Sequence, residues 1–336
     1  MGKHMQRLVA LCAASILALS GCTGAKETGN SQGNDGGQEA KEKTYKIGVT
    51  QIVEHPSLDA AREGFEQALK DKGLSVKYDV QIAQGDQSNN QTIATNFASD
   101  GVDLIFANST PSAQAALNAT KDIPIIFTSV TDPVGAQLVQ SMEQPGGNVT
   151  GTTDTHPEAI PKTVEFITKY IKGNRVGMVY NAGEQNSVAQ VDQVKKAMEG
   201  TDLKIVSASV STSAEVKQAT ESLVGKVDCL YIITDNTVVS ALESVIQVAN
   251  EHDIPLFVGE LDSVKRGGFA AYGFDYYDIG YEAGEMAAQI LQDGKKPADL
   301  PVQYPQKLKL VINKKAAQEM GIELNPEWDS IAEYIE

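Results

Sequence analysis

The sequence predicts an α/β fold of two Rossmann-like lobes with parallel sheets. Apolar runs alternate with amphipathic stretches along most of the chain, and this alternation occurs twice with the same rhythm. Strand–helix alternation is typical of a parallel sheet wrapped by helices on both faces. A chain of 336 residues is also long enough to bury two cores. Two similar lobes therefore explain the pattern better than one continuous sheet.

The first series of elements begins at Tyr45. Its expected strands are Tyr45–Thr50, Val76–Ala83, Leu104–Ala107 and Ile123–Thr128, and its expected helices are 58–72, 88–100 and 111–120. In the first helix, apolar residues recur at helical spacing from Leu58 to Leu69. Gly73 follows, as a glycine does at the end of a helix.

The second series repeats this rhythm from Pro157 onward. Its expected strands are Arg175–Tyr180, Leu203–Ala208, Cys229–Ile233 and Pro255–Val258, and its expected helices are 157–172, 186–199, 213–224 and 237–251. Three late elements remain, which are a strand Gly268–Gly273, a helix 276–292 and a strand Lys307–Ile312. They are too few for a third domain.

The N-terminal segment is similar to a bacterial lipoprotein signal. Lys3 and Arg7 precede an apolar stretch from Leu8 to Leu19, and Gly21-Cys22 closes it. This stretch is too short to span a bilayer, which takes roughly 20 residues. The resemblance to a lipobox implies that residues 1–21 are a signal peptide and that Cys22 is acylated. Two or more acyl chains would hold the protein on a membrane. A plain secretory signal with a chance cysteine is the alternative.

A flexible linker is expected after the lipidated Cys22, over residues 22–43. After the cysteine it contains no large apolar residue, so it cannot bury enough surface to fold. Loss of Lys3 and Arg7 leaves 26 of the 28 basic residues against 44 acidic ones, a net charge of −18. This balance argues against nucleic acid as a partner, because phosphates require a basic face.

Cysteine usage excludes a disulfide within the mature chain. Cys12 leaves with the signal and Cys22 is acylated, so Cys229 stands alone. Its apolar surroundings predict an inert, buried thiol.

Sequence motifs of nucleotide hydrolysis and of catalysis are absent. The chain has no G-x-x-x-x-G-K-[S/T] loop, no G-x-S-x-G elbow, no H-E-x-x-H helix and no C-x-x-C pair. The four histidines show no metal-ligand spacing; they are His4, His55, His156 and His252. We expect no cofactor, no metal and no enzymatic activity.

Four segments resemble the substrate-binding lipoproteins of ABC importers, which have the type I periplasmic-binding-protein architecture. They are IGVTQIVEHP (47–56), FTSVTDPVG (127–135), PGGNVTG (145–151) and YN (180–181). The likeness extends from residue 44 to the C-terminus and is nearest to the branch associated with tryptophan, tyrosine and phenylalanine uptake. It implies a three-segment hinge, with an N-terminal lobe of 44–152 plus 274–302 and a C-terminal lobe of 153–273 plus 303–336.

The resemblance also implies a function. The protein would capture an aromatic amino acid between its lobes and deliver it to a permease that a separate ATPase drives. It would act as a monomer on the outer face of the cytoplasmic membrane, extracellular or periplasmic, anchored by lipid. Open alternatives are a sugar or signalling metabolite as ligand, a lipid-anchored enzyme, and a surface adhesin or sensor. Sugar sites favour aromatic platforms, and Trp328 is expected in a surface segment.

Candidate ligand contacts follow the carboxyl ends of the strands, where open α/β sheets bind ligands. Ser109 and Thr110 begin a helix, where free N–H groups suit a carboxylate. Helix capping by these hydroxyls is the alternative reading. Ser129 and Thr131 offer a second set of donors after the next strand.

The loop after the first strand carries Gln51 and His55. Pro56 favours an extended backbone at His55, so its ring can face the cleft. We expect it to hydrogen-bond a ring substituent of the ligand, with packing against the following helix as the alternative.

A buried ammonium group needs an anionic partner. The candidates, in order of preference, are Asp235, Asp154, Glu260 and Asp262. Asn181 and Asn236 lie beside them as further polar contacts. Each acid could equally cap a helix. The aromatic residues Tyr180, Phe274 and Tyr276 could stack on the ligand or belong to the core.

Overall fold

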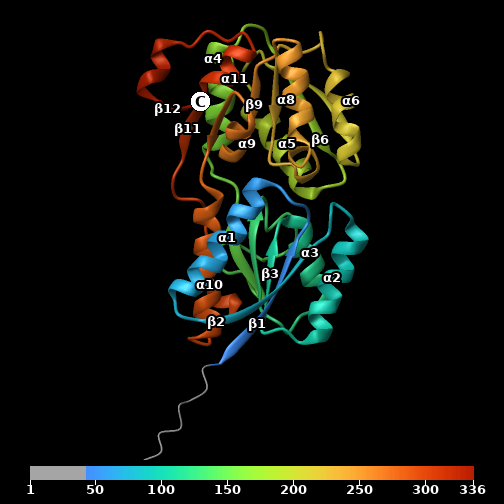
Figure 1. Ribbon diagram of the computed structural model, residues 1–336, viewed down its shortest axis with the longest axis vertical. Helices are drawn as coiled ribbons and strands as arrows, with labels where there is room; N and C mark the ends of the chain where they lie inside the picture. Colours follow the sequence, from blue (N-terminus) through green and yellow to red (C-terminus); the bar gives the residue numbers. More distant parts are fainter. Residues whose placement is uncertain (1–42) are drawn as a thin grey trace, which may run out of the picture. The chain divides into compact units, whose positions relative to one another are not determined.

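The computed structural model describes residues 43–336. The predicted signal peptide, the lipidation site Cys22 and nearly all of the linker 22–43 lie outside the described residues. The described chain forms two α/β lobes, each built around its own sheet (Figure 1).

The first lobe contains a five-stranded parallel sheet in the order β2-β1-β3-β4-β5. Its strands are β1 (Thr44–Gln51), β2 (Ser75–Ile82), β3 (Leu104–Asn108), β4 (Ile125–Val130) and β5 (Val149–Thr153). Its helices are α1 (Pro56–Asp71), α2 (Gln87–Asp100), α3 (Thr110–Ala119) and the late α10 (Tyr276–Leu291). Every residue of β3, β4 and β5 is buried, as expected for parallel strands that are covered on both faces.

Two glycines let α10 pack on the first lobe although it comes late in the chain. A Cβ on Gly280 would collide with the backbone of Ala61, and one on Gly64 would collide with the carbonyl of Tyr277. The helices α1 and α10 therefore touch backbone to backbone and lie side by side (Figure 1).

The second lobe contains a seven-stranded sheet in the order β12-β11-β10-β9-β8-β6-β7. Its strands are β6 (Arg175–Asn181), β7 (Lys204–Val210), β8 (Cys229–Ile232), β9 (Leu256–Val258), β10 (Ala270–Gly273), β11 (Lys309–Asn313) and β12 (Ala332–Ile335). Its helices are α4 (Ala159–Tyr170), α5 (Gln185–Ala197), α6 (Val216–Glu221), α7 (Asn236–Val239), α8 (Leu242–Glu251), α9 (Leu261–Arg266) and α11 (Lys314–Glu319). Short 3₁₀ turns occur at Ser213–Glu215, Pro297–Asp299 and Pro326–Ser330.

One pair of strands in the second sheet departs from the parallel arrangement that the sequence predicts. β10 and β11 are antiparallel, whereas the other neighbours are parallel. The chain leaves β10 at its carboxyl end to form α10 in the first lobe. It returns to the second sheet at the same end, where the parallel strands terminate, so β11 must run in the direction opposite to β10.

The chain passes between the lobes three times, after β5, after β10 and before β11. Two of these passages are hydrogen-bonded to each other, because Thr153 N–H donates to the Gln303 carbonyl at 2.9 Å. The predicted residue boundaries of the lobes stay a prediction.

The structure corrects the expectation for Trp328, which is 3% exposed rather than on the surface. The turn Pro326–Ser330 places its ring against Phe166, Tyr170 and Phe269. β11 and β12 join the C-terminal segment to the second sheet and so bury this ring. Cys229 is buried as predicted, and burial raises its pKa to about 12.

Several predicted elements differ from the observed ones. The helix expected over 237–251 is broken between α7 and α8, and the one over 213–224 begins as a 3₁₀ turn. β5 was not predicted, because its residues Val149–Thr153 are mostly small or polar and show no apolar run. Its threonines are nevertheless buried; Thr150 donates to the Leu300 carbonyl at 2.6 Å.

Candidate functional site

Loops from the two lobes meet at the carboxyl ends of the strands and bond directly to each other. Ser57 Oγ, at the start of α1, donates to Glu260 Oε2 of the second lobe at 2.8 Å. Gln190 Nε2 of α5 donates to Thr131 Oγ1 of the first lobe at 3.1 Å. These four side chains are buried. We call this region the interlobe site.

The sequence-predicted residues lie in this region. From the first lobe come Gln51, His55, Ser109, Thr110, Ser129 and Thr131; from the second come Asn181, Asp235, Asn236, Glu260 and Asp262; Asp154 lies on the passage between them. Most already have partners in their own lobe, which decides how each could serve a ligand.

Gln51 and Ser129 both bond to Asn108, the last residue of β3. Asn108 Nδ2 donates to Gln51 Oε1 at 3.0 Å, and Ser129 Oγ donates to Asn108 Oδ1 at 2.9 Å. Ser129 has a left-handed backbone with φ 56°, a conformation that costs energy outside glycine. This network fixes the loops around the start of α3.

Ser109 caps α3, since its Oγ accepts from Ser112 N–H at 3.3 Å. Thr110 Oγ1 accepts from Thr131 N–H at 3.4 Å. The Ser109 hydroxyl thus has the capping role of the alternative reading, whereas the Thr110 hydroxyl connects the start of α3 to the loop after β4. Pro56 and Pro111 stand at the first turns of α1 and α3.

Asn90 belongs to this site and was missed from the sequence. Its Oδ1 accepts from Thr50 Oγ1 and Ser112 Oγ, both at 3.3 Å, whereas its Nδ2 is buried without a partner. Asn90 shares the buried face of α2 with Ile93 and Phe97. A polar residue on this apolar stripe was the signal that could have identified it.

Asp235 has all its donors in the second lobe. It accepts from Val238 N–H at 2.8 Å, from Asn181 N–H at 2.6 Å and from Ser187 Oγ at 2.6 Å. Burial, with the nearby Glu184 carboxyl, raises the pKa of Asp235 well above its ordinary value. The side chain caps α7 and ties the ends of β6 and β8 together.

Asn236, at the start of α7, lies between Glu184 and the ring of His55. Its Nδ2 donates to Glu184 Oε2 at 2.5 Å, and its amide is near enough to the ring to raise the pKa of His55 slightly against the effect of burial. Burial and the positive charge of Arg266 lower the pKa of His55 to about 3, so this histidine is neutral at pH 7. His55 Nδ1 is buried without a hydrogen-bond partner.

Glu260 is 3% exposed, and only one of its oxygens is engaged. Oε2 accepts from Ser57 Oγ at 2.8 Å and from Ser263 Oγ at 3.1 Å, whereas no described residue donates to Oε1. Burial raises the pKa of Glu260 to about 7. Ser57 was missed from the sequence, because its partner lies 203 residues away.

Asp154 lies on the passage between the lobes, and its side chain bonds to two residues of the first lobe. It accepts from Thr131 Oγ1 at 2.9 Å and from Tyr276 O–H at 3.0 Å, and burial raises its pKa. Tyr276 stacks on Phe274, with ring centroids 5.5 Å apart. These two aromatics therefore pack together, and Tyr180 packs against the second core.

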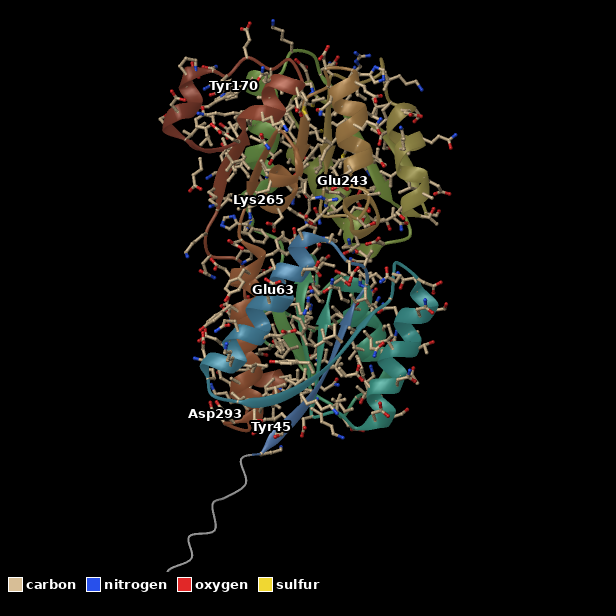
Figure 2. All side chains as sticks on the ribbon, in the orientation of Figure 1. Tyr45, Glu63, Tyr170, Glu243, Lys265 and Asp293 are labelled. Atoms are coloured by element: carbon tan, nitrogen blue, oxygen red, sulfur yellow. The ribbon has the colours of Figure 1, made fainter. Side chains whose placement is uncertain are left out.

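Asp262 differs from the other predicted acids because it already has a cation. Its carboxylate lies 2.7 Å from Lys265 Nζ. Arg266 is likewise paired, with Glu243 at 2.8 Å. Figure 2 labels Lys265, the partner of Asp262, and Glu243, the partner of Arg266, on the second lobe.

The interlobe site gathers acidic groups without neutralising them. Four buried acids contribute: Asp154, Glu184, Asp235 and Glu260. Among residues 43–336, none of the four lies within ion-pair distance of a lysine or arginine. Within the same range, no group of three acidic, histidine or cysteine residues is arranged to hold a metal ion. A buried carboxyl without a countercharge is stabilised when a cation is placed beside it.

Beside these groups lies a cavity of about 470 Å³ to which both lobes contribute. Ile52 and Val53 give it an apolar wall, and Asn181, Glu184 and Asn236 give it a polar one. The volume is that of a pocket for a small molecule. In the described part of the chain, no helix has the length and apolar character needed to cross a bilayer.

The pattern of the family described as ABC transporter substrate binding protein matches residues 46–333. A tyrosine-binding protein of Clostridioides difficile (strain R20291) is 46% identical over 314 residues, which cover 92% of this chain and 90% of that protein.

Two solved structures differ in ligand state. The structure of an ABC domain from Streptococcus pneumonia in complex with L-Trp is 35% identical, with a TM-score of 0.83, and covers 88% of this chain and 100% of that chain. The ligand-free, open structure of a substrate binding protein with adhesive properties from Clostridium difficile is 43% identical, with a TM-score of 0.64, and covers 87% and 99%. Proteins that bind sugars or myo-inositol, at 16% and 18% identity, share the fold alone.

Proposed function

This chain belongs to the ABC transporter substrate-binding protein family, and from that premise we propose that its interlobe site captures an aromatic amino acid for a membrane permease. The observation that carries the ligand class is the set of four buried carboxyl groups without a lysine or arginine partner, beside which a ligand ammonium group would be stabilised. A relative named for tyrosine and a neighbour solved with L-Trp support the aromatic side chain.

Glu260 is the proposed partner of the ligand ammonium. Its Oε1 is free to accept, and its neighbours Ser57 and Ser263 hold the other oxygen in place. Asp235, the first choice from the sequence, already accepts three hydrogen bonds, and Asp262 has Lys265. A cation stabilises a buried carboxyl group most when one of its oxygens has no hydrogen bond, because the protein then offsets less of the cost of burying the charge.

The start of α3 and Asn90 form the proposed carboxylate site. A helix N-terminus attracts anions through its dipole and its unused N–H groups. At α3 the Thr110 N–H can serve, because Pro111 has no N–H and the Ser112 N–H donates to Ser109 Oγ. Asn90 Nδ2, an enclosed donor without an acceptor, supplies a second and independent reason. A ligand carboxylate placed there would satisfy this amide and bond to the loops fixed by Asn108.

Ligand capture is proposed to act through lobe closure. This chain matches the Trp-bound neighbour better in structure than the open one, although it is more identical in sequence to the open one. The direct bonds from Ser57 to Glu260 and from Gln190 to Thr131 belong to a closed arrangement. Contacts of one ligand with both lobes would favour that state over an open one.

The remaining proposals concern the setting of the protein. The resemblance of the N-terminal segment supports a lipid anchor at Cys22 on the outer face of the membrane. We further propose a monomer without catalytic activity, which works with a permease and a separate ATPase. The family matches are to substrate-binding transport proteins rather than to enzymes.

The test uses the protein without its first 22 residues. Native mass spectrometry should show one ligand per chain after incubation with tyrosine, tryptophan or phenylalanine. Calorimetric titration should give a micromolar or tighter dissociation constant for at least one of them, about −8 kcal/mol or better. Glucose serves as the control ligand. Binding of glucose with none of the three amino acids would refute the proposed ligand class.

A further inference from the structure

The buried face of α5 changes from polar to apolar along the helix. Asn186, Ser187 and Gln190 form its first part, whereas Val191 and Val194 pack into the core of the second lobe. Gln190 is only 5% exposed although its side chain ends in an amide. Buried amides are expected to have hydrogen-bond partners. The partners of Gln190 therefore show what the polar part of this helix does.

Thr234 holds both ends of the Gln190 amide within the second lobe. Gln190 Oε1 accepts from the Thr234 N–H at 3.2 Å, and Gln190 Nε2 donates to Thr234 Oγ1. Because a backbone N–H can only donate, the atom that it meets must be the amide oxygen, which fixes the orientation of the amide. An amide nitrogen carries two hydrogens. Nε2 therefore has one hydrogen left for an acceptor outside its own lobe.

This remaining hydrogen is donated to the first lobe. Gln190 Nε2 lies 3.1 Å from Thr131 Oγ1, and Thr131 is also 5% exposed. Thr131 lies in the loop after β4, and its N–H donates to Thr110 Oγ1 at the start of α3. The bond thus joins α5 to the loop beside the proposed carboxylate site. It can form only when the two lobes are together.

Thr131 connects this contact to the chain segments that pass between the lobes. Its Oγ1 donates to Asp154 Oδ1 at 2.9 Å, and Asp154 Oδ2 accepts from the Tyr276 hydroxyl at 3.0 Å. Asp154 directly follows β5, and Tyr276 begins α10 after the passage from β10. A continuous row of hydrogen bonds therefore runs from Gln190 to two of the three passages. Hydrogen bonds in such buried rows strengthen one another.

We propose that Gln190 is a positioning residue that holds the lobes closed through Thr131, without any contribution from the ligand. The ligand-free protein then has a closed population, and a ligand binds to a site that is already assembled in that fraction. This inference rests on the proposed function and names a residue that controls lobe closure. One net hydrogen bond of this kind changes the ratio of closed to open protein by about three- to tenfold.

Single-molecule fluorescence energy transfer measures the closed fraction directly. One dye is attached at Gln91→Cys in α2 and the other at Lys217→Cys in α6, both at exposed positions, in the protein used for the ligand titrations. Cys229 is buried and its pKa is raised to about 12, so it should stay unlabelled. The ligand-free protein should show a closed and an open population. Saturating tyrosine or tryptophan should leave the closed one alone.

Gln190→Met keeps the length of the side chain and removes its hydrogen bonds. The ratio of closed to open ligand-free protein should fall by about three- to tenfold. The dissociation constant for tyrosine or tryptophan should rise by the factor by which the closed fraction falls. A residue that only stabilised its own lobe would not link these two measurements. Gln318→Met, at an exposed glutamine of α11, is the matched control and should change neither.

The same bond can be broken from the first lobe. Thr131→Val removes the hydroxyl and should lower the closed fraction of the ligand-free protein, whereas Thr131→Ser keeps the hydroxyl and should preserve it. The double variant with Gln190→Met and Thr131→Val should be no more open than the more open single variant, because both changes remove one interaction.

The outcomes separate this inference from the proposed function. A closed fraction that is unchanged in Gln190→Met would overturn the inference, and so would a ligand-free wild-type protein without a closed population. A loss of affinity at an unchanged closed fraction would make Gln190 a ligand contact and would overturn it as well. If the closed fraction falls as expected but no amino acid binds, the proposed ligand class is refuted and the role of Gln190 stands.

Discussion

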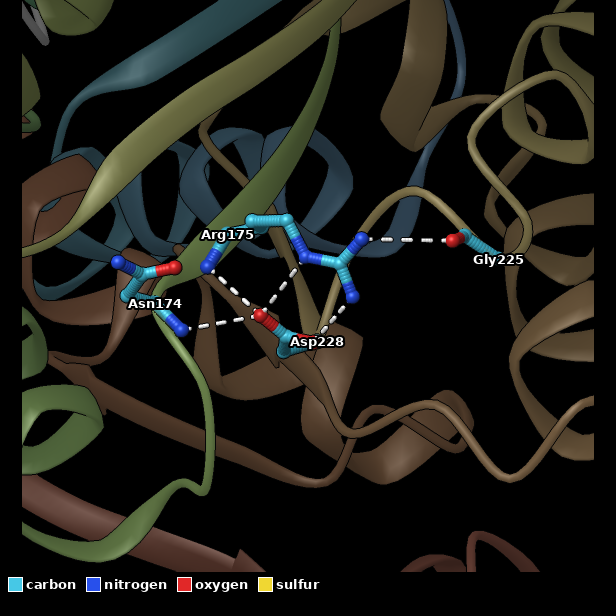
Figure 3. A network of polar contacts seen from close by, with 4 residues as sticks. All are labelled: Asn174, Arg175, Gly225 and Asp228. Carbon is cyan, nitrogen blue, oxygen red and sulfur yellow. Dashed lines mark hydrogen bonds and ion pairs between the residues drawn. The ribbon is translucent and has the colours of Figure 1, made fainter.

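The two ends of β8 carry acids in opposite electrostatic situations. Asp228 precedes the strand and accepts from the backbone N–H groups of Asn174 and Arg175, at 2.9 and 2.8 Å, and from the Arg175 guanidinium (Figure 3). This ion pair lowers the pKa of Asp228 to about 2. Asp235 follows the strand, is fully buried, has no cation and has a raised pKa.

This difference distinguishes acids that stabilise the folded lobe from acids that can bind a charged ligand. An acid at the amino ends of the strands receives its countercharge from its own lobe, so folding alone satisfies it. The buried acids at the carboxyl ends, above all Glu260, receive hydroxyl and amide donors but no countercharge, unlike the half-buried Asp262. We infer that these groups await a cation from outside the chain.

The largest effect on ligand affinity is expected from a substitution at Glu260. Glu260→Gln keeps an oxygen for Ser57 and Ser263 but removes the charge, so amino-acid affinity should fall by about 2–4 kcal/mol. Calorimetry measures the loss, and circular dichroism checks the fold. Asp262→Asn, at an acid already paired with Lys265, is the matched control and should change affinity by less than about 0.5 kcal/mol.

Asp235→Asn completes this comparison between neighbouring acids. It should lower the free energy of unfolding, measured by urea denaturation, more than it lowers the free energy of ligand binding, because three donors of the second lobe hold Asp235. A larger loss of affinity in this variant than in Glu260→Gln would restore Asp235 as the ammonium partner.

An intermediate effect is expected at the other end of β8. Asp228→Asn removes charged hydrogen bonds to Arg175 and should lower the free energy of unfolding by about 1–3 kcal/mol. Urea denaturation with the ligand absent measures the change. Ligand affinity should be unaltered, so a matching loss of affinity would argue against the division between structural and ligand-facing acids.

The smallest expected effect is the pH dependence of binding. The pKa of Glu260 is about 7 in the ligand-free protein, and only the ionised form attracts an ammonium. Affinity should therefore be about tenfold weaker at pH 6 than at pH 8. Glu260→Gln should remove most of this difference. Equal affinities of the wild-type protein at the two pH values would contradict the assignment.

The same raised pKa has a consequence for stability. The folded ligand-free protein binds this proton more tightly than the unfolded chain, whose glutamate pKa is about 4.3. The contribution is fully present below about pH 4 and is lost as the pH rises through 7. Asp228 behaves oppositely, because its lowered pKa favours the folded state above about pH 4.

The family and the fold class predicted from the sequence are confirmed, and some details are wrong for local reasons. Alternating strands and helices were visible because buried parallel strands read as apolar runs. β5 was invisible because threonines fill it. Trp328 was misplaced because nothing near it in sequence shows that β12 adds to the second sheet.

The predicted ligand contacts remain a prediction, but the structure separates them by their partners. Strand-end polar residues are visible in a sequence, since local patterns locate the strand ends. Whether an acid is satisfied depends on donors elsewhere in the chain. Asp228 and Glu260 are both acids beside short buried strands, yet only the first has an arginine beside it.

The two-lobed alternation and the family could be predicted from the amino-acid sequence, because periodicity and short motifs are properties of neighbouring residues. The pairs that face each other across the lobes, such as Ser57 with Glu260 and Gln190 with Thr131, could be identified only in the folded structure. The chain passes between the lobes three times and so brings together residues that are far apart in sequence, such as Ser57 and Glu260, which are 203 positions apart. No local sequence pattern encodes such a proximity.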